Sequence, residues 1–283
     1  MIAIVCGLAA ALMWGVSALC TSRSTRLIPP IAVLGWVLLI GVVISAPFAL
    51  SMGVPESFEG EHAIWLLVVA VGNTTGLLCA YSALRFGKVG VVAPIISAQG
   101  AAAAILALFA GEQLAAGAGL ALGAIVVGVV LAGMARTGEE EEHRRHEGIA
   151  VTFAIVAAGF FGLGLYAMGR LADDLPVAWI VFPTRGIAVL ALTVPLAFLG
   201  RLRMTRDAMP LVLASGVLEV LGLVAYNLGA REGIAITAII SSQFAAFAAV
   251  TAYFLFRERL AWIQVTGVVV IAVGVAVLTG LQV

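Results

Sequence analysis

Long apolar stretches follow one another along almost the whole chain, and they constrain the fold more than any other feature. About 20 consecutive apolar residues in a helix cross the hydrocarbon core of a bilayer. The chain is 63% hydrophobic and 11% charged, with a mean hydropathy of +1.17, and a soluble domain cannot bury that much apolar surface. We therefore predict an all-α integral membrane protein with ten transmembrane helices, at residues 1–20, 31–52, 62–84, 89–110, 113–134, 149–169, 176–199, 208–230, 234–256 and 260–281.

Charge and cysteine content exclude several classes of protein. The formal net charge is zero and no basic stripe is present, so we expect no nucleic-acid partner. Cys6, Cys20 and Cys79 lie in or beside apolar runs, without the spacing of a metal site, and are interpreted as small packing residues. No basic segment precedes the first apolar run, so residues 1–20 are expected to be a retained helix rather than a cleaved signal peptide.

One long polar stretch, RTGEEEEHRRHE (136–147), interrupts the apolar pattern. It holds His143 and His146, but a stretch of mixed charge is more typical of a solvated linker than of a metal site. The chain has no phosphate-cradling glycine loop, no nucleophile elbow and no paired-histidine metal motif. We therefore expect no metal, no cofactor and no enzymatic activity.

The two parts of the chain on either side of this stretch repeat each other. At an offset of 146 residues, infrequent residue types fall on like ones, which chance alignment of alanines and valines does not explain. The matched pairs include Pro30 with Pro176, Gly76 with Gly222, Arg85 with Arg231, Glu112 with Glu258 and Gly128 with Gly274. We predict two five-helix halves, 1–134 and 149–283, joined by a charged linker, 135–148. An odd number of helices per half makes the second half inverted across the membrane, as in many alternating-access carriers.

Lysines and arginines are distributed unevenly over the predicted loops. The loops after the first, third, fifth, seventh and ninth spans hold twelve of them, and the other loops hold two. Because positively charged loops stay in the cytoplasm, we predict a cytoplasmic linker and both termini outside. The expected location is the inner (plasma) membrane.

Two segments carry a resemblance to a known family. YSALRFGKVGVVAPIISAQ (81–99) with GEQL (111–114) resembles the end of an EamA domain. YNLGAREGIAITAIISSQ (226–243) with RERL (257–260) resembles its second copy. Ten spans in two halves are similar to the drug/metabolite transporter superfamily over essentially the whole chain. The resemblance implies a secondary carrier of small organic metabolites, often moved outward, and does not imply one substrate.

Glu219 is a carboxylate about half-way along the eighth predicted span, where a charge is costly. Arg185 lies at a similar depth in the seventh span, and Asn73 is the residue equivalent to Glu219 in the first half. An acid and a base at like depth suggest a pair that faces the bundle interior and marks a pathway. The alternative is a pair that only fixes helix packing.

Other polar and aromatic residues are candidates for the same substrate site. They can hydrogen-bond a polar metabolite, but they can equally tie helices together or pack as ordinary membrane residues. We expect the substrate-binding set to be Glu219, Arg185, Asn73, Gln99, Tyr226, Gln243, Ser97, Tyr81 and Trp14.

The function that these features predict is secondary active export of small polar organic metabolites, such as amino acids, by alternating access. Our coupling hypothesis is that Glu219 takes up a proton when Arg185 moves away. A flippase for lipid-linked substrates is the main alternative, and a membrane-integral enzyme is disfavoured because no buried histidine or second carboxylate accompanies Glu219. The expected partners are a small-molecule substrate and the lipid bilayer. The small-residue face at 119–123 fits a monomer or a homodimer.

Overall fold

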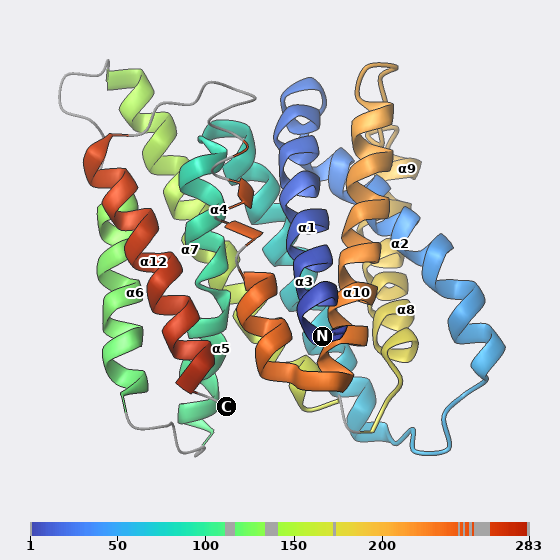
Figure 1. Ribbon diagram of the computed structural model, residues 1–283. Coiled ribbons are helices and arrows are strands. Elements are labelled where there is room, and N and C mark those ends of the chain that lie inside the picture. The colour runs from blue at the N-terminus through green and yellow to red at the C-terminus, as the bar shows by residue number, and fades with distance from the viewer. Residues whose placement is uncertain are drawn as a thin grey trace.

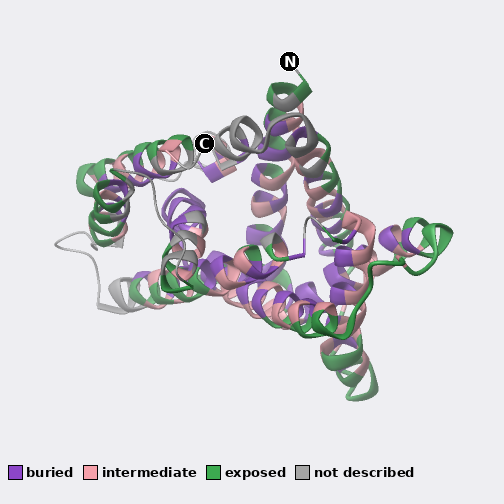
Figure 2. Ribbon diagram, turned by 90° about the horizontal axis from the view of Figure 1, so that it is seen from below, coloured by how far each residue is buried: buried purple, intermediate pink, exposed green. Residues whose placement is uncertain are grey.

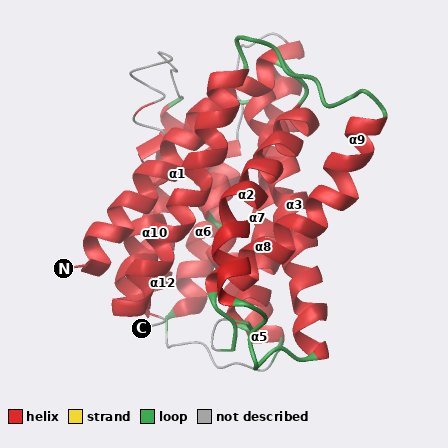
Figure 3. Ribbon diagram, turned by 90° about the vertical axis from the view of Figure 1, so that its right-hand side faces the viewer, coloured by secondary structure: helices red, strands yellow, loops and turns green. Residues whose placement is uncertain are grey.

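A computed structural model of the protein describes residues 2–110, 117–133, 141–171, 174–242, 244–245, 247–248, 251 and 261–281. These residues form helices joined by short loops and include no strand (Figure 3). The helices lie side by side, with α6 and α12 together at one edge and α2 toward the other (Figure 1). The principal helices are α1 (Ile2–Leu27), α2 (Pro30–Met52), α3 (Gly60–Phe86), α4 (Val89–Ser97), α5 (Gln99–Phe109), α6 (Ala118–Gly133), α7 (Glu141–Gly169), α8 (Val177–Ala188), α9 (Val194–Phe198), α10 (Met209–Ser242) and α12 (Trp262–Leu281), with a π-helical turn, η1 (Val189–Thr193), between α8 and α9.

The helices have the length and surface of membrane spans. Within the described part of the chain, six are apolar and long enough to cross a bilayer, and three shorter apolar helices accompany them. Large apolar side chains are exposed, among them Leu120 at 83% and Phe198 at 89%. In Figure 2 the exposed positions lie mostly on the outward faces of the helices and the buried positions mostly toward neighbouring helices. Such a surface is suited to lipid rather than water. The chain is therefore a multi-pass α-helical membrane protein.

Two helices extend past the boundaries predicted for the spans. The charged linker was predicted at 135–148, and α7 begins within it, at Glu141. Its first residues, Glu, Arg and His, tolerate a helix, and Glu141 stands four residues before Arg145, a spacing that stabilises helices. A break was also expected at residues 231–233, but α10 continues to Ser242. Gly233 weakens a helix by only about 1 kcal/mol and no proline is present there, so the backbone remains helical.

The fourth predicted span is instead divided into α4 and α5 at Ala98. The Ser97 hydroxyl donates to the Pro94 carbonyl at 2.7 Å, and the Ala98 N–H bonds to the Ile95 carbonyl at 3.1 Å. Pro94 O would be the partner of Ala98 N–H in a regular α-helix. A side-chain hydroxyl that competes for a backbone carbonyl thus interrupts the helix.

Equivalent helices of the two halves pack against each other in antiparallel fashion. A methyl group added at Gly128 of α6 would lie 2.8 Å from Ile271 of α12, and one added at Gly274 of α12 would lie 2.7 Å from Ile125 of α6. The same exchange relates α3–α7 to α1–α10, because Gly76 lies against the Phe161 ring and Gly222 lies against the Trp14 ring. Contacts made by one half are therefore repeated with the halves exchanged.

Candidate functional site

A buried ion pair joins α8 to α10. The Arg185 guanidinium donates through Nη2 to the Glu219 carboxylate at Oε1, and the two side chains are only 7% and 14% exposed. Arg185 lies on α8 one turn before η1, and its aliphatic stem lies against Gly41 of α2. The acid and the base that the sequence predicted at like depth therefore contact each other.

Each member of the pair has a second polar atom that the pair does not use. Arg185 Nη1 and Glu219 Oε2 are buried and have no hydrogen-bond partner among the described residues. Leaving a buried polar atom unpaired costs about 1–3 kcal/mol, and more for a charged group. An arrangement with one unpaired donor and one unpaired acceptor is suited to a ligand that carries both an acceptor and a donor.

Trp14 of α1 forms an aromatic wall beside the acid. Its indole Nε1–H donates to the Glu219 backbone carbonyl at 3.3 Å, and its ring lies 5.9 Å from Tyr226 and 6.4 Å from Phe244. Gly222 makes this possible, because a methyl group there would lie 2.5 Å from Trp14 Nε1. The glycine thus admits the indole to the α1–α10 contact.

Hydroxyl groups continue the polar region along α1 and α10. Ser17 and Thr21 of α1 both hydrogen-bond the Ser215 hydroxyl, at 3.0 Å and 2.7 Å. The Tyr81 hydroxyl from α3 lies near the Ser215 and Thr21 hydroxyls and within electrostatic range of Glu219 and Arg185. Sequence reasoning missed the three serine and threonine residues. Their only signal was the spacing of Ser215, which stands one helical turn before Glu219.

The other predicted site residues lie elsewhere. Asn73 of α3 is at the α3–α7 contact beside Gly164, and its Oδ1 is buried without a partner in the described part of the chain. The Ser97 hydroxyl bonds to Pro94 of its own helix. The backbone carbonyl of Gln99 lies against Gly162 of α7.

The contacts of the predicted residues fall on two sets of helices. One, at α1, α8 and α10 with Tyr81, contains the ion pair and the aromatic wall. The other lies at α3, α4 and α5, where Asn73 and Gln99 meet α7. Gln243 lies outside the described residues.

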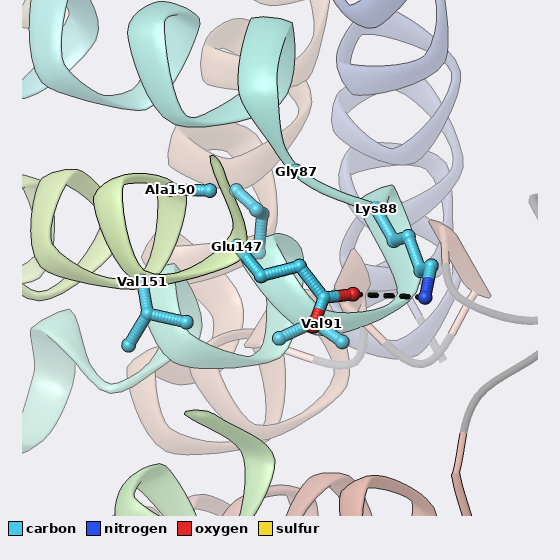
Figure 4. Close-up of a pocket in the computed structure, with 7 residues that line it drawn as sticks. Gly87, Lys88, Val91, Glu147, Ala150 and Val151 are labelled. Carbon is cyan, nitrogen blue, oxygen red and sulfur yellow. Dashed lines mark hydrogen bonds and ion pairs between the residues drawn. The ribbon is translucent and has the colours of Figure 1, made fainter. Parts of the chain in front are cut away.

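Two further polar contacts connect the parts of the chain before and after residue 140. Lys88 Nζ donates to Glu147 Oε1 at 2.8 Å in a small pocket that Gly87, Val91, Ala150 and Val151 also line (Figure 4). At the opposite end of the α3–α7 pair, His62 Nε2 lies 3.3 Å from Asp174 Oδ2. The α3–α7 pair thus carries a polar contact at each end.

The EamA-like transporter family model matches residues 1–134 and 148–280, which together make up most of the chain. The chain belongs to the EamA-like transporter family. Members of this family are transporters rather than enzymes, and the apolar helices agree with a membrane protein of that kind. The EamA-like match falls on the two halves that flank the polar stretch.

Comparisons with more distant proteins show only the fold of this EamA-like transporter. No curated protein matches the chain. A solved structure described as "Crystal structure of protein" is 19% identical, with a TM-score of 0.61, and the alignment covers 99% of this chain and 97% of that one. The likeness shows that the whole chain shares one known fold.

Proposed function

We propose that the chain is built of ten transmembrane helices in two inverted five-helix halves, 1–134 and 149–283. The repeated sequence offset supports this arrangement, as do the antiparallel contacts of Gly128 with Ile271 and of Gly274 with Ile125. If equivalent helices run antiparallel, the two halves cross the membrane in opposite senses. The distribution of lysine and arginine supports a plasma-membrane topology with the linker 135–148 in the cytoplasm and both termini outside.

Within that architecture the protein is a secondary active exporter of small polar organic metabolites, such as amino acids, by alternating access. The observation that carries the proposal is the buried Arg185–Glu219 pair, with its unpaired Nη1 and Oε2 beside the Trp14 wall. An overall neutral site with an unpaired donor and an unpaired acceptor favours a ligand that carries groups of both kinds. A purely structural bundle needs no such pair, because apolar packing is often as stable as a buried ion pair.

Glu219 is the group that couples transport to protons. While Arg185 is paired with it, the carboxylate is stabilised by the opposite charge. When substrate or the movement of a helix withdraws Arg185, Glu219 is left in an apolar site and takes up a proton. One full cycle then exchanges a substrate for a proton across the membrane.

The first experiment identifies the substrate and tests the acid together. Metabolites inside and outside cells that express the wild type, Glu219→Gln or no protein are compared without choosing targets in advance. The wild type is expected to enrich at least one polar metabolite outside. Purified protein in vesicles, loaded with that metabolite, then reports pH-dependent net transport.

Glu219→Gln keeps the side-chain volume but cannot titrate. We expect it to insert and fold, to lose the pH dependence of net transport, and to retain exchange of substrate for substrate. Wild-type pH dependence in this variant would refute the coupling role. Loss of folding would favour a packing role, because removing one member of a buried pair costs roughly 3–5 kcal/mol.

A further inference from the structure

A chain of buried hydroxyl groups runs along α1 and α10 beside the ion pair. Ser215, Ser17 and Thr21 are 0%, 7% and 1% exposed. Ser215 precedes Glu219 by four residues, which places the two side chains on the same face of α10, one turn apart. Thr21 follows Ser17 by one turn of α1 and lies two residues before the exposed Arg23. The chain of hydroxyls thus extends from the acid toward the arginine-bearing end of α1.

The hydroxyls are hydrogen-bonded to one another and not only to the backbone. The Ser215 hydroxyl lies 3.0 Å from Ser17 Oγ and 2.7 Å from Thr21 Oγ1, and in each contact either oxygen can be the donor. A hydroxyl both donates and accepts a hydrogen bond, so the direction of each bond can reverse by rotation of the O–H. That reversibility is what a path for protons requires, and a backbone carbonyl lacks it.

The corresponding contact in the other half lacks these groups. The α3–α7 pair repeats the packing of α1–α10. At the offset of 146 residues, however, Val69 stands where Ser215 would be and Leu163 where Ser17 would be. In the α3–α7 contact, Gly72 approaches the Gly164 backbone so closely that an added methyl group would lie 2.9 Å from Gly164 N. Close packing of these helices therefore does not require hydroxyls at these positions, and of the two contacts only α1–α10 has them there.

We propose that Ser215, Ser17 and Thr21 form a proton relay between Glu219 and the Arg23 end of α1. This inference rests on the proposed function, in which Glu219 is protonated and deprotonated. On release, the Glu219 O–H bond breaks and the proton goes to the Ser215 oxygen, while Ser215 gives its own hydroxyl proton to Thr21 or Ser17. That hydroxyl in turn gives its own proton to water at the Arg23 end of α1. Each hydroxyl accepts one proton and gives one, so every group is regenerated, and no redox change occurs.

The described hydrogen bonds of Glu219 engage its Oε1 and its backbone carbonyl, and leave Oε2 without a partner among the described residues. Arg185 on α8 donates to Oε1 of Glu219, and Trp14 on α1 donates to the backbone carbonyl of Glu219. Tyr226 on α10 lies beside the Trp14 ring. Tyr81 from α3 lies near the Ser215 and Thr21 hydroxyls. When Arg185 withdraws, the freed carboxyl can rotate along its own helix face toward Ser215.

The test follows protonation of the carboxyl group directly and needs no substrate. Full-length protein in lipid nanodiscs is subjected to a rapid pH jump, and the infrared band of the protonated carboxyl is recorded over time. Glu219→Gln identifies the band that belongs to Glu219. We expect Ser215→Ala to keep the amplitude of that band but to slow its change by about tenfold or more, because positioned proton-transfer groups accelerate such steps by at least that factor. Ser215→Thr, which retains a hydroxyl, is expected to restore the rate.

Two controls separate a relay from a packing role. Ser45 is a buried serine on α2 whose hydroxyl bonds only within its own helix, to Gly41 at 2.7 Å and Val42 at 3.5 Å, so Ser45→Ala is expected to leave the rate unchanged. Thr21→Val keeps the shape of the side chain at the far end of the relay but removes its hydroxyl. It replaces Ser215→Ala as the test variant if Ser215→Ala does not fold. An unchanged rate in Ser215→Ala and Thr21→Val, with or without a lower melting temperature, overturns the relay and leaves the role of Glu219 standing. The absence of any band that Glu219→Gln removes overturns both.

Discussion

At the scale of residues, glycines decide whether the charged and aromatic groups can meet. Gly41 leaves room for the Arg185 stem, whose Cδ would lie 3.4 Å from an added methyl group. Gly222 leaves room for the Trp14 indole, which bonds to the Glu219 carbonyl. A methyl group at Gly222 must displace the indole, whereas one at Gly41 would make an ordinary contact with the Arg185 stem. The positions of the polar and aromatic side chains at the site therefore depend on glycines, which have no functional side chain of their own.

Replacing Gly222 with alanine tests this dependence. The new methyl group would lie 2.5 Å from Trp14 Nε1 and 2.7 Å from Trp14 Cδ1, so the indole must shift and its hydrogen bond is lost. We expect Gly222→Ala to lower the stability by about 1–3 kcal/mol, as overpacking commonly does. The matched control is Gly119→Ala on α6, where nothing lies within 4 Å of the added group. Thermal unfolding of the purified variants measures the difference, and equal melting temperatures for the two would contradict the prediction.

At the scale of elements, interruptions of the helices occur beside the candidate site residues. The break between α4 and α5 separates Ser97 from Gln99, and the π-helical turn η1 begins four residues after Arg185. Thr193 at the end of η1 donates to the Gly35 carbonyl of α2 at 3.2 Å, which fixes that turn against its neighbour. Turns of π-helix are rare and are frequent at functional sites. Arg185 therefore lies one turn before a segment whose backbone departs from a regular α-helix.

Two glycines in the α6–α12 contact are expected to differ in how well they tolerate an added methyl group. A methyl group at Gly128 would meet backbone atoms of α12, 2.9 Å from Ile271 N and 3.0 Å from Gly267 O, which cannot move independently of the helix. At Gly274 the only contact below 3.4 Å is to the Ile125 side chain, which can adjust. We expect Gly128→Ala to be destabilising by about 1–3 kcal/mol and Gly274→Ala by less. Unfolding in detergent compares the two, and a larger loss for Gly274→Ala would show that the packing is not as described.

At the scale of the whole molecule, the halves are similar in packing and different in chemistry. The α1–α10 contact holds the ion pair's acid, the indole and the hydroxyls. The equivalent α3–α7 contact is packed through glycines in its middle and carries the Lys88–Glu147 and His62–Asp174 pairs toward its ends. The ion pair's acid, the indole and the hydroxyls therefore lie at only one of these two contacts.

The predicted orientation is tested by reporters of location. A reporter fused after Val283 is expected to be active outside the cytoplasm, and one inserted at residues 136–140 is expected to be active inside, because twelve of the fourteen loop lysines and arginines lie on that side. A cytoplasmic signal after Val283 would overturn the orientation. It would leave the inverted repeat intact, since that rests on the relation between the halves.

The apolar runs of the sequence are sufficient to show that the chain is helical and membrane-embedded. Backbone polar groups in lipid must be satisfied within a helix, so long apolar runs leave no other fold. A fixed rise of about 1.5 Å per residue then places Glu219 and Arg185 at like depth. The position of a side chain around its helix, and which helix it faces, depends on packing between elements distant in sequence. For that reason the tertiary structure was needed to show which predicted polar residues contact one another, that α10 continues past Gly233, that the fourth span is interrupted at Ala98, and that Ser17 and Thr21 bond to Ser215.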